Sequence, residues 1–225
     1  MFLLLFFELQ QNRNFLRGEK WPKGPDGNAI VPYYITGTFN KEQRQLIAAG
    51  MMLYHKNTCI RFVPWTDNYS YKLEIVNNDD DFCGYGQYCH QPNETTYLWL
   101  NEDCTSFLDT VIHEIGHVMC YKHEHSRPDR DEYLKFDWKK CVHPEQMQIT
   151  DWKDVNTVDL PFDYLSNMIY GHICTDGCAK PKLPGISNCG SPVMSIVDIE
   201  KYNAFYDCGG NQHYKLSPPS KHCLY

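Results

Sequence analysis

Apolar and polar residues follow two different periods along the first half of this chain of 225 residues. Segments rich in β-branched and aromatic side chains, separated by turn-forming residues, cover residues 29–36, 60–63, 71–76 and 97–100. This composition is typical of β-strands. The pattern therefore predicts a sheet in the first half of the chain.

Two segments with helical periodicity accompany these strands. In the first segment, Asn40 and Gln43 have the spacing of an N-terminal capping box. The apolar residues of that segment recur at helical spacing, at Leu46, Ile47, Met51 and Tyr54. A helix of about four turns is predicted here, packed against the sheet.

The second helical segment begins near Ser106, which together with Asp109 also resembles a capping box. Its apolar stripe consists of Leu108, Val111, Ile112, Ile115 and Met119. A helix buries such a stripe against the core. The polar face, which carries His113 and His117, is therefore predicted to face a cleft.

The second half of the chain shows little sustained periodicity. Residues 128–192 are rich in Pro, Gly, Asp and Cys, and a helical pattern returns near residues 197–206. This pattern predicts an irregular lobe that is held by disulfides and closed by one helix. We expect a substrate to bind between this lobe and the sheet.

The net charge is −7, and lysine and arginine form no cluster, so neither nucleic acid nor an anionic membrane is expected as a partner. No segment reaches the roughly 18 apolar residues of a transmembrane helix. Residues 2–7 are apolar but lack a basic flank and are shorter than the core of a usual signal peptide. We interpret residues 1–13 as the remnant of a signal or pro-segment.

Eleven cysteines in a chain of this size indicate an oxidising compartment and thus a secreted, extracellular protein. An odd number leaves at least one thiol unpaired within the chain, and Cys120 is predicted to be that thiol. Asn68 in NYS and Asn93 in NET match the glycosylation acceptor pattern. Both asparagines are expected on exposed loops.

The segment with the most chemical content is HEIGH at residues 113–117. On a helix, His113 and His117 lie on one face about 6 Å apart along the axis, so both imidazoles can bind one metal ion. Glu114 is rotated from His113 by about 100°, which suits a general base acting on water better than a third ligand. An isolated HExxH motif also arises by chance on a polar helix face, so these residues alone do not establish a metal site.

A third histidine, His123, reaches the same metal only if the helix ends near Met119 and the chain turns back. Three imidazoles would leave one tetrahedral position to water, as in catalytic zinc sites, and would predict hydrolysis with one zinc ion per chain. In the alternative, the helix continues and places His113, His117 and Cys120 on one face as a His2Cys site.

Residues 113–131, HEIGHVMCYKHEHSRPDRD, resemble the active-site motif of the astacin family of metzincin peptidases, HExxHxxGxxHExxRxDRD. The SNMIY segment at residues 166–170 is similar to the Met-turn of that family, and residues 57–65 and 195–208 resemble further family segments.

Two residues depart from the family pattern. Cys120 stands where the family has a glycine, and Ile169 stands where many members have a histidine. Glycine suits a left-handed helix end, and a cysteine in that conformation costs about 1–2 kcal/mol. Zinc binding in folded peptides is worth on the order of 10 kcal/mol, so this strain alone does not abolish the site.

The resemblance implies the two-lobed α+β fold of a metzincin catalytic domain over residues 14–208. The N-terminal lobe, residues 14–123, would contain a twisted, mostly parallel sheet with a backing helix and an active-site helix. The C-terminal lobe, residues 124–208, would be irregular and disulfide-rich with one helix. Residues 209–225 would form a C-terminal extension.

The resemblance also implies a role for individual residues. The zinc ligands would be His113, His117 and His123, the catalytic residues Glu114 and Tyr170, and Met168 would form an apolar floor beneath the metal. Glu124 would contact the new N-terminus formed by activation cleavage, which we expect after Arg13. Asp129, Arg130 and Asp131 would form structural ion pairs. The implied disulfides join Cys59 to Cys208, and Cys104 to either Cys83 or Cys89.

The favoured hypothesis is a secreted, monomeric zinc endopeptidase that hydrolyses peptide bonds in a protein or peptide substrate. In this hypothesis, Glu114 takes a proton from the zinc-bound water and Tyr170 stabilises the oxyanion. One alternative is a catalytically weak or inactive secreted zinc-binding protein on the same scaffold, with Cys120 distorting or capping the metal. Another is a disulfide-rich structural module that binds no metal.

Overall fold

A computed structural model of the chain describes residues 13–78, 83–101, 104–158 and 160–209. Its main sheet has five strands in the order β3-β2-β4-β6-β5. The four strands β2 (Ala29–Thr36), β3 (Ile60–Pro64), β4 (Lys72–Asn78) and β6 (Thr95–Asn101) run parallel. The short β5 (Gly84–Gly86) runs antiparallel to β6 at the edge. The predicted mostly parallel sheet is therefore confirmed.

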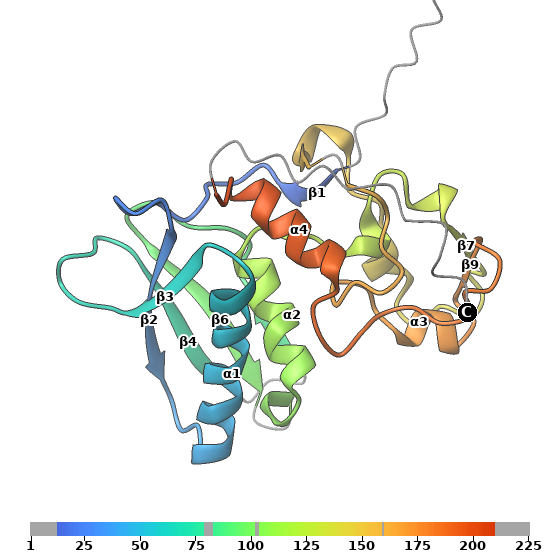
Figure 1. Cartoon of the computed structure of the whole chain (residues 1–225). Coiled ribbons are helices and arrows are strands. Elements are labelled where there is room, and N and C mark those ends of the chain that lie inside the picture. The colour runs from blue at the N-terminus through green and yellow to red at the C-terminus, as the bar shows by residue number, and fades with distance from the viewer. Residues whose placement is uncertain (1–12, 79–82, 102–103, 159, 210–225) are drawn as a thin grey trace, which may run out of the picture.

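Two helices, α1 (Lys41–Asn57) and α2 (Leu108–Val118), lie side by side against the sheet (Figure 1). They approach closely at Gly50, where a β-carbon would lie 2.8 Å from a methyl group of Val111. The capping box of Asn40 and Gln43 is present at the start of α1, as predicted.

The predicted capping box of α2 is wrong. The N-cap of α2 is Phe107, whose side chain makes no capping hydrogen bond. Ser106 instead belongs to the short 3-10 helix η1 (Cys104–Ser106), one residue too early to cap α2. Asp109 accepts a hydrogen bond from the Thr110 amide within the first turn. Packing of the apolar stripe therefore determines where α2 forms, since Val111, Ile112, Ile115 and Met119 are fully buried.

The helices and strands that follow α2 are short, except for the last one, α4. The 3-10 helices are η2 (Glu124–Ser126), η3 (Arg130–Glu132), η4 (Pro144–Met147) and η5 (Trp152–Asp154), and the other elements are β7 (Leu134–Phe136), β8 (Val155–Thr157), α3 (His172–Thr175), β9 (Ala179–Pro181) and α4 (Ile196–Phe205). Strands β7 and β9 pair antiparallel beside a small core of their own. The helix predicted near residues 197–206 is α4, which lies between the sheet and this irregular lobe (Figure 1).

The N-terminal strand β1 (Arg13–Leu16) was not predicted from the sequence. It pairs antiparallel with β8 of the second lobe. Phe15 is fully buried, and its ring stacks on Tyr121 and Phe205 at 4.7 and 4.1 Å between ring centroids. Apart from Arg13, the expected leader remnant at residues 1–13 lies outside the described residues, as does the extension beyond residue 209.

Four disulfides join described cysteines. The implied Cys59–Cys208 bond is present, and the second lobe contains the bonds Cys141–Cys178 and Cys174–Cys189. Cys120 pairs with Cys89, so the prediction of a free thiol at Cys120 is wrong. This bond also removes Cys89 as a partner of Cys104. Cys83 is disulfide-bonded, and the side chain of Cys104 lies outside the described part of the chain.

Candidate metal centre

The side chains of His113, His117 and His123 converge on one point. The Nε2 atom of His123 lies 3.1 Å from the Nε2 atoms of both other histidines. One turn of α2 separates His113 from His117, whereas His123 arrives from the chain that follows the helix. Among the described residues, these three form the one cluster of His, Cys, Asp or Glu side chains that is close enough to hold a metal ion.

Backbone carbonyls determine which nitrogen of two of these rings carries hydrogen. Nδ1 of His113 lies 2.8 Å from the Asn167 carbonyl, and Nδ1 of His117 lies 2.8 Å from the Tyr121 carbonyl. A carbonyl only accepts hydrogen bonds, so in each neutral ring Nδ1 carries the hydrogen and the Nε2 lone pair faces the centre of the cluster. Such outer hydrogen bonds orient histidine ligands in metal sites.

This set of donors fits zinc. Burial lowers the pKa of both His117 and His123 well below the ordinary value, which disfavours protons on these nitrogens. The Nε2 lone pairs of His113 and His117 both face the Nε2 atom of His123 at 3.1 Å, and a cation between the three nitrogens would stabilise this arrangement. Zinc–nitrogen bonds of about 2.0–2.1 Å in a tetrahedron place the nitrogens about 3.3 Å apart, close to this spacing.

The end of α2 brings His123 back to the metal site. The helix ends at Val118, and Cys120 takes a left-handed conformation with φ of 70°. The Tyr121 amide donates to the Gly116 carbonyl, and the Cys120 amide donates to the His117 carbonyl. These two bonds form a Schellman motif, which reverses the chain direction. The turn predicted near Met119 is confirmed, and the alternative His2Cys site is wrong because Cys120 is held in a disulfide.

Glu124 follows His123 directly, and its carboxylate is fully buried. It accepts hydrogen bonds from Lys201 at 2.7 Å, Arg127 at 3.1 Å, the Asp163 amide at 2.8 Å and the Tyr121 hydroxyl at 3.1 Å. Burial alone would raise the pKa of Glu124, but the charges of Lys201 and Arg127 bring it below the ordinary value. The carboxylate is therefore ionised and paired within the fold.

The ion pairs expected after Glu124 are also present. Arg127 forms a second, two-pronged pair with Asp129, with both N···O distances 2.8 Å. Arg130 pairs with Asp131 at 2.8 Å, and its guanidinium also donates to the carbonyls of His125 and Met147. The bond to the Met147 carbonyl joins the segment after the third histidine to η4 of the same lobe.

Met168 lies directly beneath α2. A β-carbon on Gly116 would lie 2.6 Å from the Met168 sulfur, so Gly116 allows this close approach. The Asp198 carboxylate on α4 holds the segment before Met168 through the Ser166 hydroxyl at 2.6 Å and the Asn167 amide at 2.9 Å. The Glu124 amide donates to the Met168 carbonyl at 2.8 Å, so this segment and the third histidine are held together.

The ring of Tyr170 lies beside the histidines, with its centroid 4.4 Å from that of His123 and 5.8 Å from that of His113. Burial raises the pKa of its hydroxyl to about 12. His125, which sequence analysis did not select, stacks on His123 and packs at a tilt of 42° against Tyr170. Burial lowers the pKa of His125 to about 3, so its ring is a neutral packing partner. The His-Glu-His sequence at residues 123–125 was the feature of the sequence that could have pointed to His125.

Glu114 points towards the edge strand β5. Its Oε2 accepts a hydrogen bond from the Gly86 amide at 2.8 Å. Burial raises the pKa of the carboxyl group above the ordinary value, and both His113 and the Gly86 amide oppose this shift. A raised pKa favours uptake of a proton from water, so the environment suits a general base.

Two glycines bring β5 close to Glu114, and sequence analysis missed both. A β-carbon on Gly86 would lie 2.3 Å from the Glu114 carbonyl oxygen, and one on Gly84 would lie 2.7 Å from the Glu114 Cγ. No larger residue fits at Gly86 unless β5 moves away from α2. The Gly-Tyr-Gly sequence at residues 84–86 was the feature of the sequence that could have pointed to these two glycines.

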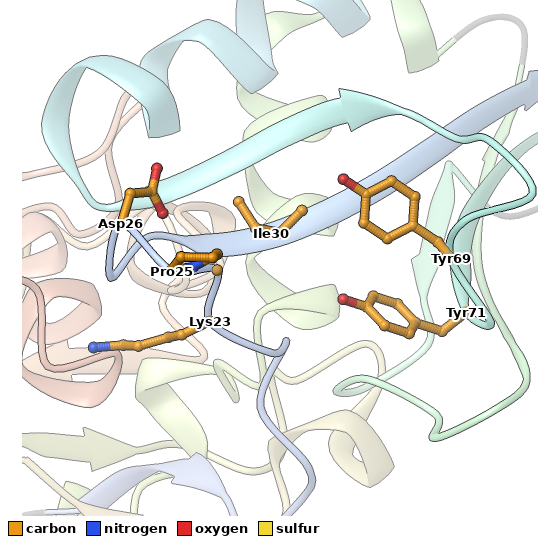
Figure 2. Close-up of a pocket in the computed structure, with 7 residues that line it drawn as sticks. Lys23, Pro25, Asp26, Ile30, Tyr69 and Tyr71 are labelled. Carbon is orange, nitrogen blue, oxygen red and sulfur yellow. The ribbon is translucent and has the colours of Figure 1, made fainter.

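A pocket of about 480 Å³ adjoins His123. It is lined by Tyr88, Lys122, His123 and Tyr170, and by residues of the segment 145–154. A second pocket of about 460 Å³ lies elsewhere, between Lys23 and Asp26 on one side and Tyr69 and Tyr71 on the other (Figure 2). None of the three histidines lines this second pocket, so it is not part of the metal centre.

Comparison with known proteins identifies the family. The family model for the astacin peptidases matches residues 16–208. Embryonic protein UVS.2 of Xenopus laevis is 29% identical over 196 residues, which cover 84% of this chain and 36% of that protein. Zinc metalloproteinase nas-5 of Caenorhabditis elegans is 30% identical over 209 residues, 86% of this chain and 57% of that protein. The chain thus spans only part of the length of both relatives.

Solved structures share the fold. High choriolytic enzyme 1 from Oryzias latipes, described as a hatching enzyme zinc-protease, matches 87% of this chain and 100% of its own, with a TM-score of 0.76 at 24% identity. Myroilysin matches 85% of this chain with a TM-score of 0.60. The family match covers most of the described residues and includes all three histidines, so this chain belongs to the astacin family of zinc metalloendopeptidases.

Proposed function

We propose that this chain is a secreted endopeptidase that hydrolyses peptide bonds in protein substrates with the help of one zinc ion. The observation that carries the proposal is the convergence of three imidazole Nε2 atoms beside the buried carboxylate of Glu114. His113, His117 and His123 would hold the zinc. When bound in such a site, zinc lowers the pKa of water to about 7 and polarises the carbonyl group to be cleaved.

Glu114 is proposed as the general base. Its carboxylate accepts the proton of the attacking water and then transfers that proton to the amine that leaves. The hydrogen bond from Gly86 keeps one carboxylate oxygen fixed, so the carboxylate stays oriented throughout both transfers.

Tyr170 is proposed as the donor that stabilises the oxyanion. A tyrosine hydroxyl is protonated at neutral pH and can donate a hydrogen bond, and burial, which raises its pKa to about 12, favours the protonated form further. Stabilisation of this kind is worth most in a buried site. The further role as a zinc ligand, which the family resemblance implies for Tyr170, stays a prediction.

Removal of the metal tests the proposal directly. Purified protein treated with a zinc chelator is expected to lose peptidase activity on a denatured protein substrate, and about one equivalent of zinc per chain should restore it. Magnesium should not restore activity, since it prefers oxygen ligands to imidazole. Full activity in protein shown to be zinc-free by metal analysis would exclude the proposed mechanism.

The approach of β5 to α2 gives a second test. Gly86→Ala is expected to displace β5 and the hydrogen bond to Glu114, and thereby to lower kcat by about 100-fold while zinc stays bound. The matched control is Gly24→Ala, whose nearest contacts would be the exposed Asp26 carboxylate at 3.1 Å and the half-buried Ile30 side chain at 3.2 Å. Equal kcat values in the two variants would show that β5 does not orient the base.

The alternative hypothesis of an inactive zinc-binding protein depended on Cys120 distorting or capping the metal. Cys120 pairs with Cys89 and neither caps the histidines nor disrupts their convergence. An endopeptidase with an intact base is therefore the better supported function.

Secretion is proposed because the fold contains four disulfides between described cysteines. Asn68 and Asn93 are both exposed, and Asn68 lies in a turn closed by the hydrogen bond from the Tyr69 amide to the Thr66 carbonyl. Both positions suit glycosylation, which stays a prediction. Within the described residues, no helix is long and apolar enough to cross a membrane. The monomeric state and the lack of nucleic-acid binding also stay predictions.

A further inference from the structure

The Cys89–Cys120 disulfide connects two segments that both contact the metal ligand His117. Cys89 belongs to the loop after β5, and Cys120 follows the end of α2. The amides of Cys89 and Cys120 both donate to the His117 carbonyl, at 3.3 and 2.8 Å. The bond therefore fastens the end of the edge strand to the turn that carries the chain from His117 to His123.

The N-terminal segment is shaped around this disulfide. A β-carbon on Gly18 would lie 2.3 Å from the Cys89 sulfur, so only glycine fits there without movement. The Leu16 amide donates to the Cys120 carbonyl, and the His90 amide donates to the Glu19 carbonyl. Both half-cystines are buried as a result. The disulfide is thus built into the packing of the surrounding chain.

Tyr88 is the residue that this arrangement positions beside the metal centre. Its ring centroid lies 4.8 Å from that of His117, and the Lys122 ammonium lies 4.7 Å from the centre of the Tyr88 ring. Tyr88 precedes one half-cystine by one residue, and Lys122 follows the other by two. Both side chains line the pocket of about 480 Å³ together with His123 and Tyr170.

We propose that the Cys89–Cys120 disulfide is a positioning element for substrate binding. It holds Tyr88 against His117 and Lys122, and so fixes one wall of the pocket that receives part of the peptide substrate next to the cleavage site. The metal ligands themselves come from α2 and the turn after it, so the disulfide acts on substrate affinity more than on the chemical step. This inference rests on the proposed peptidase function.

The test removes the disulfide without straining the backbone. Cys89 and Cys120 both have left-handed φ angles, of 65° and 70°, so the double variant C89G/C120G supplies the residue that this conformation favours. The matched control is C141A/C178A, which removes a disulfide of the second lobe that closes a loop of similar length, 37 residues against 31. Similar loops should give similar losses of melting temperature.

The wild-type chain and Glu114→Gln are assayed first on a peptide substrate, with zinc content measured for each protein. For C89G/C120G, we expect KM to rise about tenfold relative to the control variant, with kcat within about twofold and zinc content unchanged. A KM equal to that of the control overturns the inference. No turnover by the wild-type chain would instead overturn the proposed function, so the two failures are distinguishable.

If C89G/C120G does not fold, Tyr88→Ala provides a second test of the inference. This substitution leaves the disulfide intact and is also expected to raise KM, and an unchanged KM would overturn the inference. If C89G/C120G does fold, adding Tyr88→Ala to it should raise KM less than Tyr88→Ala does in the wild-type chain, because both changes remove the same wall. If Tyr88→Ala raises KM by the same factor in both backgrounds, the disulfide does not position Tyr88.

Discussion

Glu114→Gln is expected to abolish peptide hydrolysis and leave zinc binding intact. Glutamine keeps the size of the side chain, and its carbonyl oxygen can still accept the hydrogen bond from the Gly86 amide. The amide cannot take a proton from water at neutral pH. General base catalysis is typically worth a factor of about 10²–10⁴, so kcat/KM should fall at least that far.

The measurement compares kcat/KM on a peptide substrate with zinc content determined on the same sample. Glu42→Gln serves as the control, because Glu42 is an exposed residue in the first turn of α1 and contacts none of the three histidines. The control should match the wild-type chain. Retention of more than about a tenth of the wild-type activity in Glu114→Gln would be incompatible with Glu114 as the base.

Lys201→Met is expected to cause the largest loss of stability. Lys201 and Glu124 are both fully buried, and their charged atoms lie 2.7 Å apart. Without Lys201, the buried Glu124 and Asp129 share the single positive charge of Arg127, so one negative charge is left in excess, and breaking a buried ion pair typically costs about 3–5 kcal/mol. For a domain of this size, that loss corresponds to a decrease in melting temperature of roughly 10 °C. Zinc affinity should also fall, since Glu124 adjoins His123.

A double variant distinguishes charge from packing at this position. Lys201→Met combined with Glu124→Gln removes both charges, and it should recover most of the stability lost in Lys201→Met. Lys153→Met is the control, because Lys153 pairs with Asp151 at the surface, where ion pairs contribute little. Equal melting temperatures for Lys201→Met and Lys153→Met, measured by calorimetry, would contradict this account.

The buried Lys201–Glu124 ion pair also makes the stability of the fold depend on pH. The folded state holds the pKa of Glu124 below the ordinary value of 4.5. A carboxylate with a depressed pKa contributes stability above its unfolded pKa and loses that contribution as the pH falls through its folded pKa. The contribution of Glu124 is therefore complete at neutral pH and is lost on acidification below about 4.5.

Periodicity was enough to predict the helix that presents the first two histidines. The apolar stripe of α2 fixes which face is buried, so His113 and His117 had to lie opposite it. The requirement that His123 reach the same metal also predicted the end of α2 near Met119. Both inferences depend on local geometry, which the spacing of residues determines.

Contacts between distant segments could not be predicted in this way. The pairing of Lys201 with Glu124 joins residues 77 positions apart, and helical periodicity gives no sign that a lysine at that position is buried. Cysteine spacing leaves disulfide connectivity open, so Cys120 was wrongly predicted to be a free thiol. The three-residue strand β5 is too short to show a period, and its two glycines resemble those of an ordinary turn.

The residues of helix α4 that support the metal centre are synthesised after the segments that carry the three histidines. The chain leaves the ribosome from its N-terminus, so the three histidines emerge long before Asp198 and Lys201, which lie 77 residues after Tyr121 and Glu124. Cys208, the partner of Cys59, emerges later still. A nascent chain therefore carries every zinc ligand before it carries the groups that hold them in place. Ordering of the three histidines is therefore expected to follow the synthesis of α4, because Asp198 and Lys201 are added to the chain only then.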